Sequence, residues 1–119
     1  GIDVVGWVAE LQPEFERARV SVAPLRYGAG IKGKVAVSLA HGVPGVLTTI
    51  AAEGMGLRNG EEALIDDSPE GFADAIIRLY RDDDLWLRLS DAALSFVART
   101  YGRQLGQQRV AEMMALVAR

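Results

Sequence analysis

The chain contains no cysteine, only one histidine and no long apolar run. Without cysteine, disulfides and thiolate metal sites are excluded, and no Ser-His-Asp or Cys-His set can be assembled. No apolar segment approaches the ~20 residues that are needed to span a bilayer. The first ten residues, GIDVVGWVAE, lack the basic start and apolar stretch of a signal peptide. These absences predict a cytoplasmic protein.

Acidic residues are also absent from one window, between Glu16 and Glu53, although the net charge of the chain is −3. The basic residues of this window are Arg17, Arg19, Arg26, Lys32 and Lys34, and it also holds the histidine, His41. A solvated basic face is one interpretation, but a purely basic segment in an acidic chain favours an anionic ligand, most simply a phosphate. Nucleic acid is not expected as a partner, because the overall charge of the chain is acidic.

The 119 residues, half of them hydrophobic, fit a single domain with a sizeable core. Strand-like segments alternate with helical patterns and end near residues 6, 23, 48 and 66. Helices are expected at about 13–18 and 32–41, the second stopped by Gly42. The alternation predicts an α/β fold, with a parallel sheet of about four strands flanked by helices. The loop after residue 48, up to Gly56, would lie at the carboxyl edge of this sheet, where ligands bind.

The last third of the sequence predicts helices only. Ser68 is expected to cap the first of them and Pro69 to occupy its first position. Three adjacent carboxylates, at residues 82–84, are interpreted as a turn and the cap of the next helix rather than as metal ligands. Gly102 is expected to end that helix, and a final helix over 103–119 has an apolar stripe.

A glycine-rich segment, GAGIKG at residues 28–33, follows the second predicted strand and spells G-x-G-x-x-G. A dinucleotide site would need its first glycine close to the strand and an acidic residue ~20 positions later. Here Thr48 stands at that distance, and four residues separate the strand from Gly28. A dinucleotide-dependent oxidoreductase is therefore the weaker interpretation. The glycines suit a backbone that approaches a phosphate at a helix N-terminus, with Lys32 and Lys34 adding charge.

The longer stretch PLRYGAGIKGKVAVSLAHGVP, residues 24–44, resembles the donor-binding half of group 1 glycosyltransferases with the GT-B fold. In those enzymes a strand ends in proline, a glycine-containing loop opens a helix, and G-x-P closes it, as Gly42-Val43-Pro44 does here. The resemblance continues through Thr48-Thr49, AEGM at residues 52–55 and ALIDDSPEGFADAIIRLYRDD at residues 63–83, and so covers nearly the whole chain.

This resemblance implies a Rossmann-like half of a GT-B fold, which binds a nucleotide-diphosphate sugar and passes the sugar to an acceptor. It implies no cofactor and no obligatory metal, and it assigns no catalytic residue. The residues that it places near the donor are Gly28, Gly30, Lys32, Gly33, Lys34, Thr48, Thr49 and Glu53. The charge of the basic window adds Arg26 as a candidate for phosphate binding.

The resemblance also implies that residues 1–119 are one donor-binding domain, which begins late and lacks the N-terminal acceptor domain of the same chain. We therefore expect these residues to be inactive in transfer by themselves. The stripe of the final helix would pack on the acceptor domain or serve self-association. Through that domain the protein could lie at the inner face of a membrane.

One departure from the family pattern concerns a pair of glutamates, eight positions apart, of which the second usually holds the nucleotide ribose. Their positions are occupied here by Ala29 and Val37. Ribose contacts would then have to come from Ser38 or Glu53. This departure leaves open a non-catalytic module, which either binds sugar nucleotides or serves only domain contacts.

Overall fold

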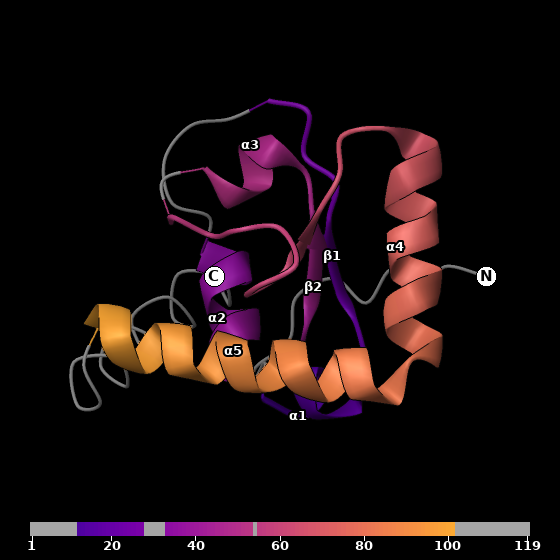
Figure 1. Ribbon diagram of the computed structural model, residues 1–119. Helices are drawn as coiled ribbons and strands as arrows, with labels where there is room; N and C mark the ends of the chain where they lie inside the picture. Colours follow the sequence, from indigo (N-terminus) through magenta and orange to yellow (C-terminus); the bar gives the residue numbers. More distant parts are fainter. Residues whose placement is uncertain (1–11, 28–32, 54, 102–119) are drawn as a thin grey trace.

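The computed structural model describes residues 12–27, 33–53 and 55–101, and within them three strands form one parallel sheet (Figure 1). The strands β1 (Ser21–Ala23), β2 (Gly45–Leu47) and β3 (Leu64–Ile65) are hydrogen-bonded in the order β1-β2-β3. The helices are α1 (Gln12–Arg17), α2 (Gly33–Ala40), α3 (Thr49–Ala52), α4 (Pro69–Arg81) and α5 (Asp83–Tyr101). The predicted α/β fold with a parallel sheet is confirmed. The strand expected near residue 6 and the helix expected over 103–119 lie outside the described residues.

Helices cover both faces of the sheet, and the strand residues alternate between them. Val46 and Leu64 pack against α4, whereas Leu47 faces α2 and α3. In Figure 1, α4 stands on one side of the strands, α2 and α3 on the other, and α5 crosses below. The described core therefore consists of two apolar clusters, one on each face.

Helix ends follow the capping chemistry that the sequence predicts. Ser68 Oγ accepts a hydrogen bond from the Gly71 amide, and Pro69 stands in the first turn of α4. Asp82 Oδ1 accepts from the Leu85 amide at 3.0 Å, so the carboxylate does cap the start of α5. Gly42, two residues beyond the end of α2, has a φ of +71°, a conformation that favours glycine.

Helix α3 lies in a segment that the sequence predicts to be loop, and this part of the prediction is wrong. Thr48 is its N-cap, and Thr48 Oγ1 accepts from the Ala51 amide at 3.3 Å. A single helical turn is too short to show a 3.6-residue periodicity, so the pattern of apolar residues could not reveal it.

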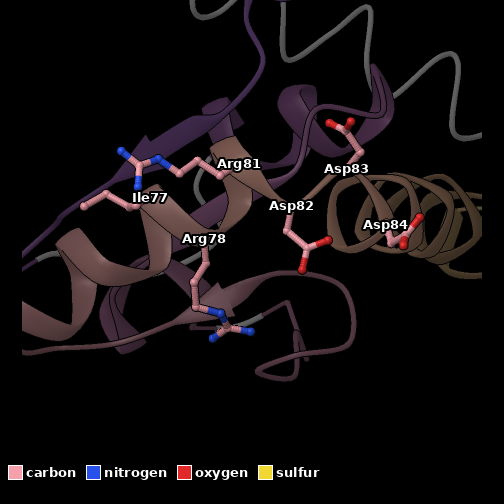
Figure 2. Close-up of a pocket in the computed structure, with 6 residues that line it drawn as sticks. All are labelled: Ile77, Arg78, Arg81, Asp82, Asp83 and Asp84. Carbon is pink, nitrogen blue, oxygen red and sulfur yellow. The ribbon is translucent and has the colours of Figure 1, made fainter.

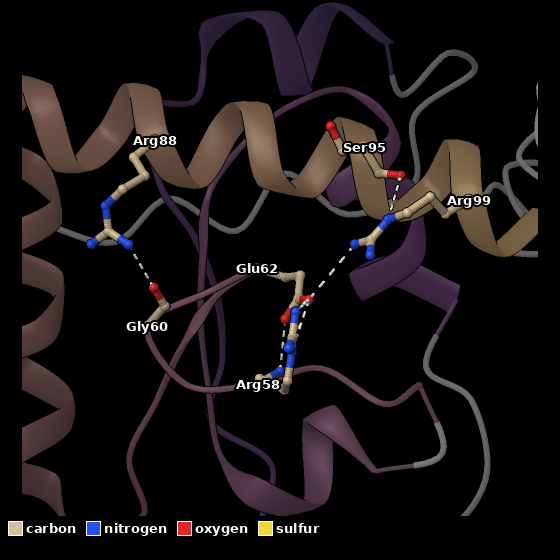
Figure 3. Close-up of polar contacts among 6 residues, drawn as sticks. All are labelled: Arg58, Gly60, Glu62, Arg88, Ser95 and Arg99. Atoms are coloured by element: carbon tan, nitrogen blue, oxygen red, sulfur yellow. Dashed lines mark hydrogen bonds and ion pairs between the residues drawn. The ribbon is translucent and has the colours of Figure 1, made fainter.

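The loop before β3 is fastened to α5 by arginine side chains (Figure 3). Arg58 binds the buried carboxylate of Glu62 with its backbone amide and its guanidinium. From α5, Arg88 donates to the Gly60 carbonyl at 2.8 Å, and Arg99 lies 3.9 Å from Glu62 Oε1.

Candidate functional site

The three parallel strands end at one edge of the sheet, and threonine side chains join the segments that leave it. Thr48 Oγ1 donates to the Leu25 carbonyl at 2.7 Å, which fixes the loop after β1. The amide and hydroxyl of Thr49 donate to the two carboxylate oxygens of Asp67, at 2.8 and 2.6 Å, which fixes the loop after β3. The end of β2 is therefore bonded to the loops on both sides of it.

Asp67 is held as a carboxylate by these contacts. The hydrogen bonds from the side chain and the backbone amide of Thr49 lower the pKa of Asp67 below its ordinary value. Its side chain is exposed, so this edge of the sheet presents a negative charge near neutral pH.

A first hollow, of about 470 Å³, lies where α2 begins. It is lined by Ser21, Val22, Ala23, Pro24, Leu25, Gly33, Lys34 and Val35. Lys34 is exposed, and the first turn of α2 contains no acidic residue. The unpaired amides of a helix N-terminus and an adjacent lysine both attract an anion.

A second hollow, of about 390 Å³, lies between the loop after β1, the loop after β3 and α4. It is lined by Pro24, Arg26, Thr48, Asp67, Ser68, Pro69, Phe72, Ala73 and Ile76. Pro24 belongs to both hollows, so the two are neighbours at the same edge of the sheet.

The structure distributes the site residues expected from the sequence over these two hollows. Gly33 and Lys34 line the first, and Arg26 and Thr48 line the second. Thr49 uses its side chain to hold Asp67. The other expected residues are placed as follows: Glu53 is exposed at the C-cap of α3 and lines neither hollow, and Gly28, Gly30 and Lys32 lie outside the described residues.

Two residues of α2 concern the ribose contacts that the sequence analysis considered. Val37 is fully buried, so the position of the usual glutamate faces the core. Ser38 is 2 % exposed, and its hydroxyl donates to the Val43 carbonyl at 3.0 Å. Ser38 as a ribose contact is therefore a wrong expectation, because its side chain is enclosed in the fold and already bonded there.

Asp67 and Ser68 line the second hollow, and sequence reasoning did not include them among the expected site residues. Their signal was the position of the IDDSP segment directly after a strand, at the edge where ligands bind. The pairing of Asp67 with Thr49 joins residues that are 18 positions apart, and no local pattern announces it.

The junction of α4 and α5 carries a third hollow, lined by Ile77, Arg78, Arg81, Asp82, Asp83 and Asp84 (Figure 2). In Figure 2 these side chains fan out instead of converging on one point. Asp82 caps α5 and Asp83 pairs with Arg19, so two of the three carboxylates have structural partners. In residues 12–27, 33–53 and 55–101, no group of three or more His, Cys, Asp or Glu side chains is arranged to hold a metal ion.

His41 follows the end of α2 and is half-buried. Its ring stacks on Phe15, with 5.1 Å between the ring centroids. Its Nε2 is buried and has no hydrogen-bond partner among the described residues. His41 lines neither of the two hollows at the strand ends, so the geometry gives it no role in binding there.

Comparison with known proteins identifies a family whose matched segment includes both hollows. The family model for group 1 glycosyl transferases matches residues 1–82 of the 119, a span that contains the sheet and every residue of both hollows. No curated protein matches the chain significantly. None of the helices in the described part of the chain is long and apolar enough to cross a membrane. The chain belongs to the group 1 glycosyltransferase family.

Proposed function

We propose that the chain is the donor-binding domain of a glycosyltransferase of GT-B type. It binds a nucleotide-diphosphate sugar, whose sugar passes to an acceptor held mainly by a second domain. The observation that carries this proposal is the start of α2 at the carboxyl edge of the sheet, with Lys34 exposed in its first turn beside a hollow. Membership of the family supplies the class of reaction.

The role of this site is electrostatic. When the sugar leaves the nucleotide, negative charge develops on the departing diphosphate, and cations or amide groups fixed beforehand stabilise it. The amides that open α2 and the ammonium of Lys34 would supply this stabilisation without a metal ion. Arg26, on the neighbouring hollow, adds a second positive charge to the same edge.

The second candidate function is a binding module without turnover. It is favoured by Val37, which is fully buried where many members carry the glutamate that holds the ribose. Glu53 is the acidic residue left to contact the ribose or donor sugar, and it is exposed at the end of α3.

Calorimetric titration with uridine and guanosine diphosphate sugars, and with NAD, tests the proposal. We expect a nucleotide sugar to bind and NAD not to bind. Lys34→Ala removes a charge-assisted hydrogen bond worth about 1.5–3 kcal/mol, so donor affinity should fall about 10- to 100-fold. Glu53→Gln should cost less, because glutamine still accepts hydrogen bonds.

The matched control is Arg81→Ala, which removes one exposed cation from the far end of α4. Its donor affinity should equal that of the wild type, and the melting temperatures of all variants should stay close together. Unchanged donor binding in Lys34→Ala would refute the phosphate site. Donor binding without sugar transfer, measured in the chain joined to its acceptor domain, would establish the binding module instead.

A further inference from the structure

The second hollow, between the loop after β1 and helix α4, contributes the charge of Arg26 to the edge described above, but its apolar wall has no role in the donor site. We propose that it binds a pyranose ring of the acceptor glycan, beside the hollow that Lys34 lines. This inference rests on the sugar-transfer chemistry of the proposed function, but it concerns a second hollow and a different ligand.

The path of the chain explains why a hollow forms here. The segment after β1 leads to α2 on one face of the sheet, whereas the segment after β3 leads to α4 on the other face. The two loops diverge above the end of β2, and such a divergence leaves a crevice in which α/β proteins bind ligands. Thr48, at the end of β2, lines its base.

The lining combines an apolar wall with a polar rim. The wall consists of Pro24, Pro69, Phe72, Ala73 and Ile76, and the polar groups are Arg26, Thr48, Asp67 and Ser68. A pyranose ring has the same division, because its C–H groups form apolar faces while its hydroxyl groups project at the edge. About 390 Å³ is in the range of small-molecule pockets and is ample for one such ring.

Asp67 has the hydrogen-bonding capacity that a sugar requires. A carboxylate offers about four lone-pair positions, and Thr49 occupies one on each oxygen. The remaining positions can accept sugar hydroxyls, and Arg26 can donate to them. Because one carboxylate and one guanidinium share the hollow, its charges balance, which favours a neutral saccharide over an anion.

The test is a titration of the ¹⁵N-labelled chain, followed by amide chemical shifts. The probes are methyl α-D-glucopyranoside, methyl α-D-mannopyranoside, inorganic phosphate and uridine diphosphate. We expect at least one glycoside to cause saturable shifts at the amides of Thr48, Asp67 and Phe72. Phosphate should leave these amides unchanged, and uridine diphosphate should shift those of Gly33 and Lys34.

Substitutions in the second hollow test whether the amide chemical shifts arise from glycoside binding there. Ala73→Leu, on the exposed side of α4, fills the hollow without disturbing the core and should abolish the glycoside shifts. Asp67→Asn should weaken glycoside binding about tenfold, the effect of losing one charged acceptor. The control Asp74→Asn removes an exposed carboxylate from the same helix outside the hollow and should bind as the wild type does.

Separate outcomes bear on the two proposals. Lys34→Ala should lose uridine diphosphate binding and keep the glycoside shifts. The inference is overturned if neither glycoside causes saturable shifts, if Ala73→Leu leaves them intact, or if phosphate competes for the hollow. Loss of both ligands in Lys34→Ala would show a single site and overturn it as well.

Discussion

At the scale of single residues, the most constrained ionic contact among the described residues is that of Glu62. Its side chain is 3 % exposed, whereas those of its partners Arg58 and Arg99 are 65 % and 64 % exposed (Figure 3). Burying a carboxylate is costly unless it is paired, and Arg58 satisfies it with three hydrogen bonds. The cost of breaking the pair therefore depends on which partner is removed.

Arg58→Ala is expected to destabilise the protein more than Glu62→Gln. The first change removes the guanidinium that lies closest to a buried carboxylate and leaves Arg99, at 3.9 Å, as its remaining cation, so it should cost more than the second. Glu62→Gln leaves the arginines solvated and puts a neutral side chain that still forms hydrogen bonds in place of the carboxylate. It should lower the free energy of unfolding by about 1–2 kcal/mol. Arg88→Ala, which loses one exposed bond to Gly60, should cost less than either. Urea denaturation measures all three, and the reverse order for the first two would contradict this argument.

Acid should weaken the fold through two carboxylates. Burial raises the pKa of Glu62, but the hydrogen bonds and the charge of Arg58 outweigh it, and the pKa lies below the ordinary value. The bonds from Thr49 lower the pKa of Asp67 as well. In both cases the folded state binds fewer protons than the unfolded chain. Their stabilisation is therefore complete above the unfolded pKa values of about 4 and is lost as the pH falls through the folded values.

This pH dependence can be measured as the urea midpoint from neutral to strongly acidic pH. We expect the urea concentration at the midpoint to decrease when the pH is lowered below about 4. The fall should be smaller in Glu62→Gln, which cannot titrate at that position. In Thr49→Val the pKa of Asp67, followed by carboxyl NMR shifts, should move up toward its ordinary value. If the urea midpoint of the wild type rose in acid, the predicted direction of the pH dependence would be wrong for both Glu62 and Asp67.

At the scale of elements, the start of α4 depends on a close approach between a side chain and a glycine. Asp66 Oδ1 accepts hydrogen bonds from the amide and the hydroxyl of Ser68, both at 2.8 Å. This holds the carboxylate over Gly71, where an added Cβ would lie 2.2 Å from Asp66 Oδ2. The glycine in the first turn thus leaves room for this carboxylate, and its φ is not in the left-handed region.

Gly71→Ala should therefore destabilise the protein, against the usual gain of about 0.5–1 kcal/mol for this change in a helix. In the background of Asp66→Ala the obstacle is absent, so the same substitution should become stabilising. A double-mutant cycle by thermal or urea unfolding measures the coupling between the two positions. Additive effects of the two changes would show that the contact does not constrain the helix.

The elements that the sequence predicted correctly are those whose causes are local. Ser68 and Pro69 predict the start of α4, and Gly42 predicts the end of α2. Short apolar runs predict the strands. The contacts at the strand ends depend instead on tertiary structure, because the pairing of β2 with β3 is what brings Thr49 next to Asp67. The sequence could therefore place Lys34 and Thr48 at the carboxyl edge of the sheet, but it could not reveal the second hollow or the position of Asp67 in it.

At the scale of the whole molecule, α5 connects the two apolar clusters on opposite faces of the sheet. Leu85 and Leu89 belong to the cluster under α4, while Ala93 and Phe96 belong to the one under α2. The helix crosses below the sheet, whereas α3 and the start of α4 lie at its top (Figure 1). The site is thus supported on both faces by layers that share one helix, and the two faces should lose their structure together.

Leu89→Ala tests this coupling. Leu89 is fully buried, so its truncation should cost about 2–5 kcal/mol. Because α5 joins the layers, native-state hydrogen exchange should show the same loss of protection at the amides of Leu39 in α2 and Leu79 in α4. The control Leu87→Ala removes a leucine that is 56 % exposed on the same helix and should change stability by no more than about 0.5 kcal/mol. Protection lost at Leu79 and kept at Leu39 would mean that the faces open independently, and that the proposed donor site on the α2 side does not depend on the α4 layer.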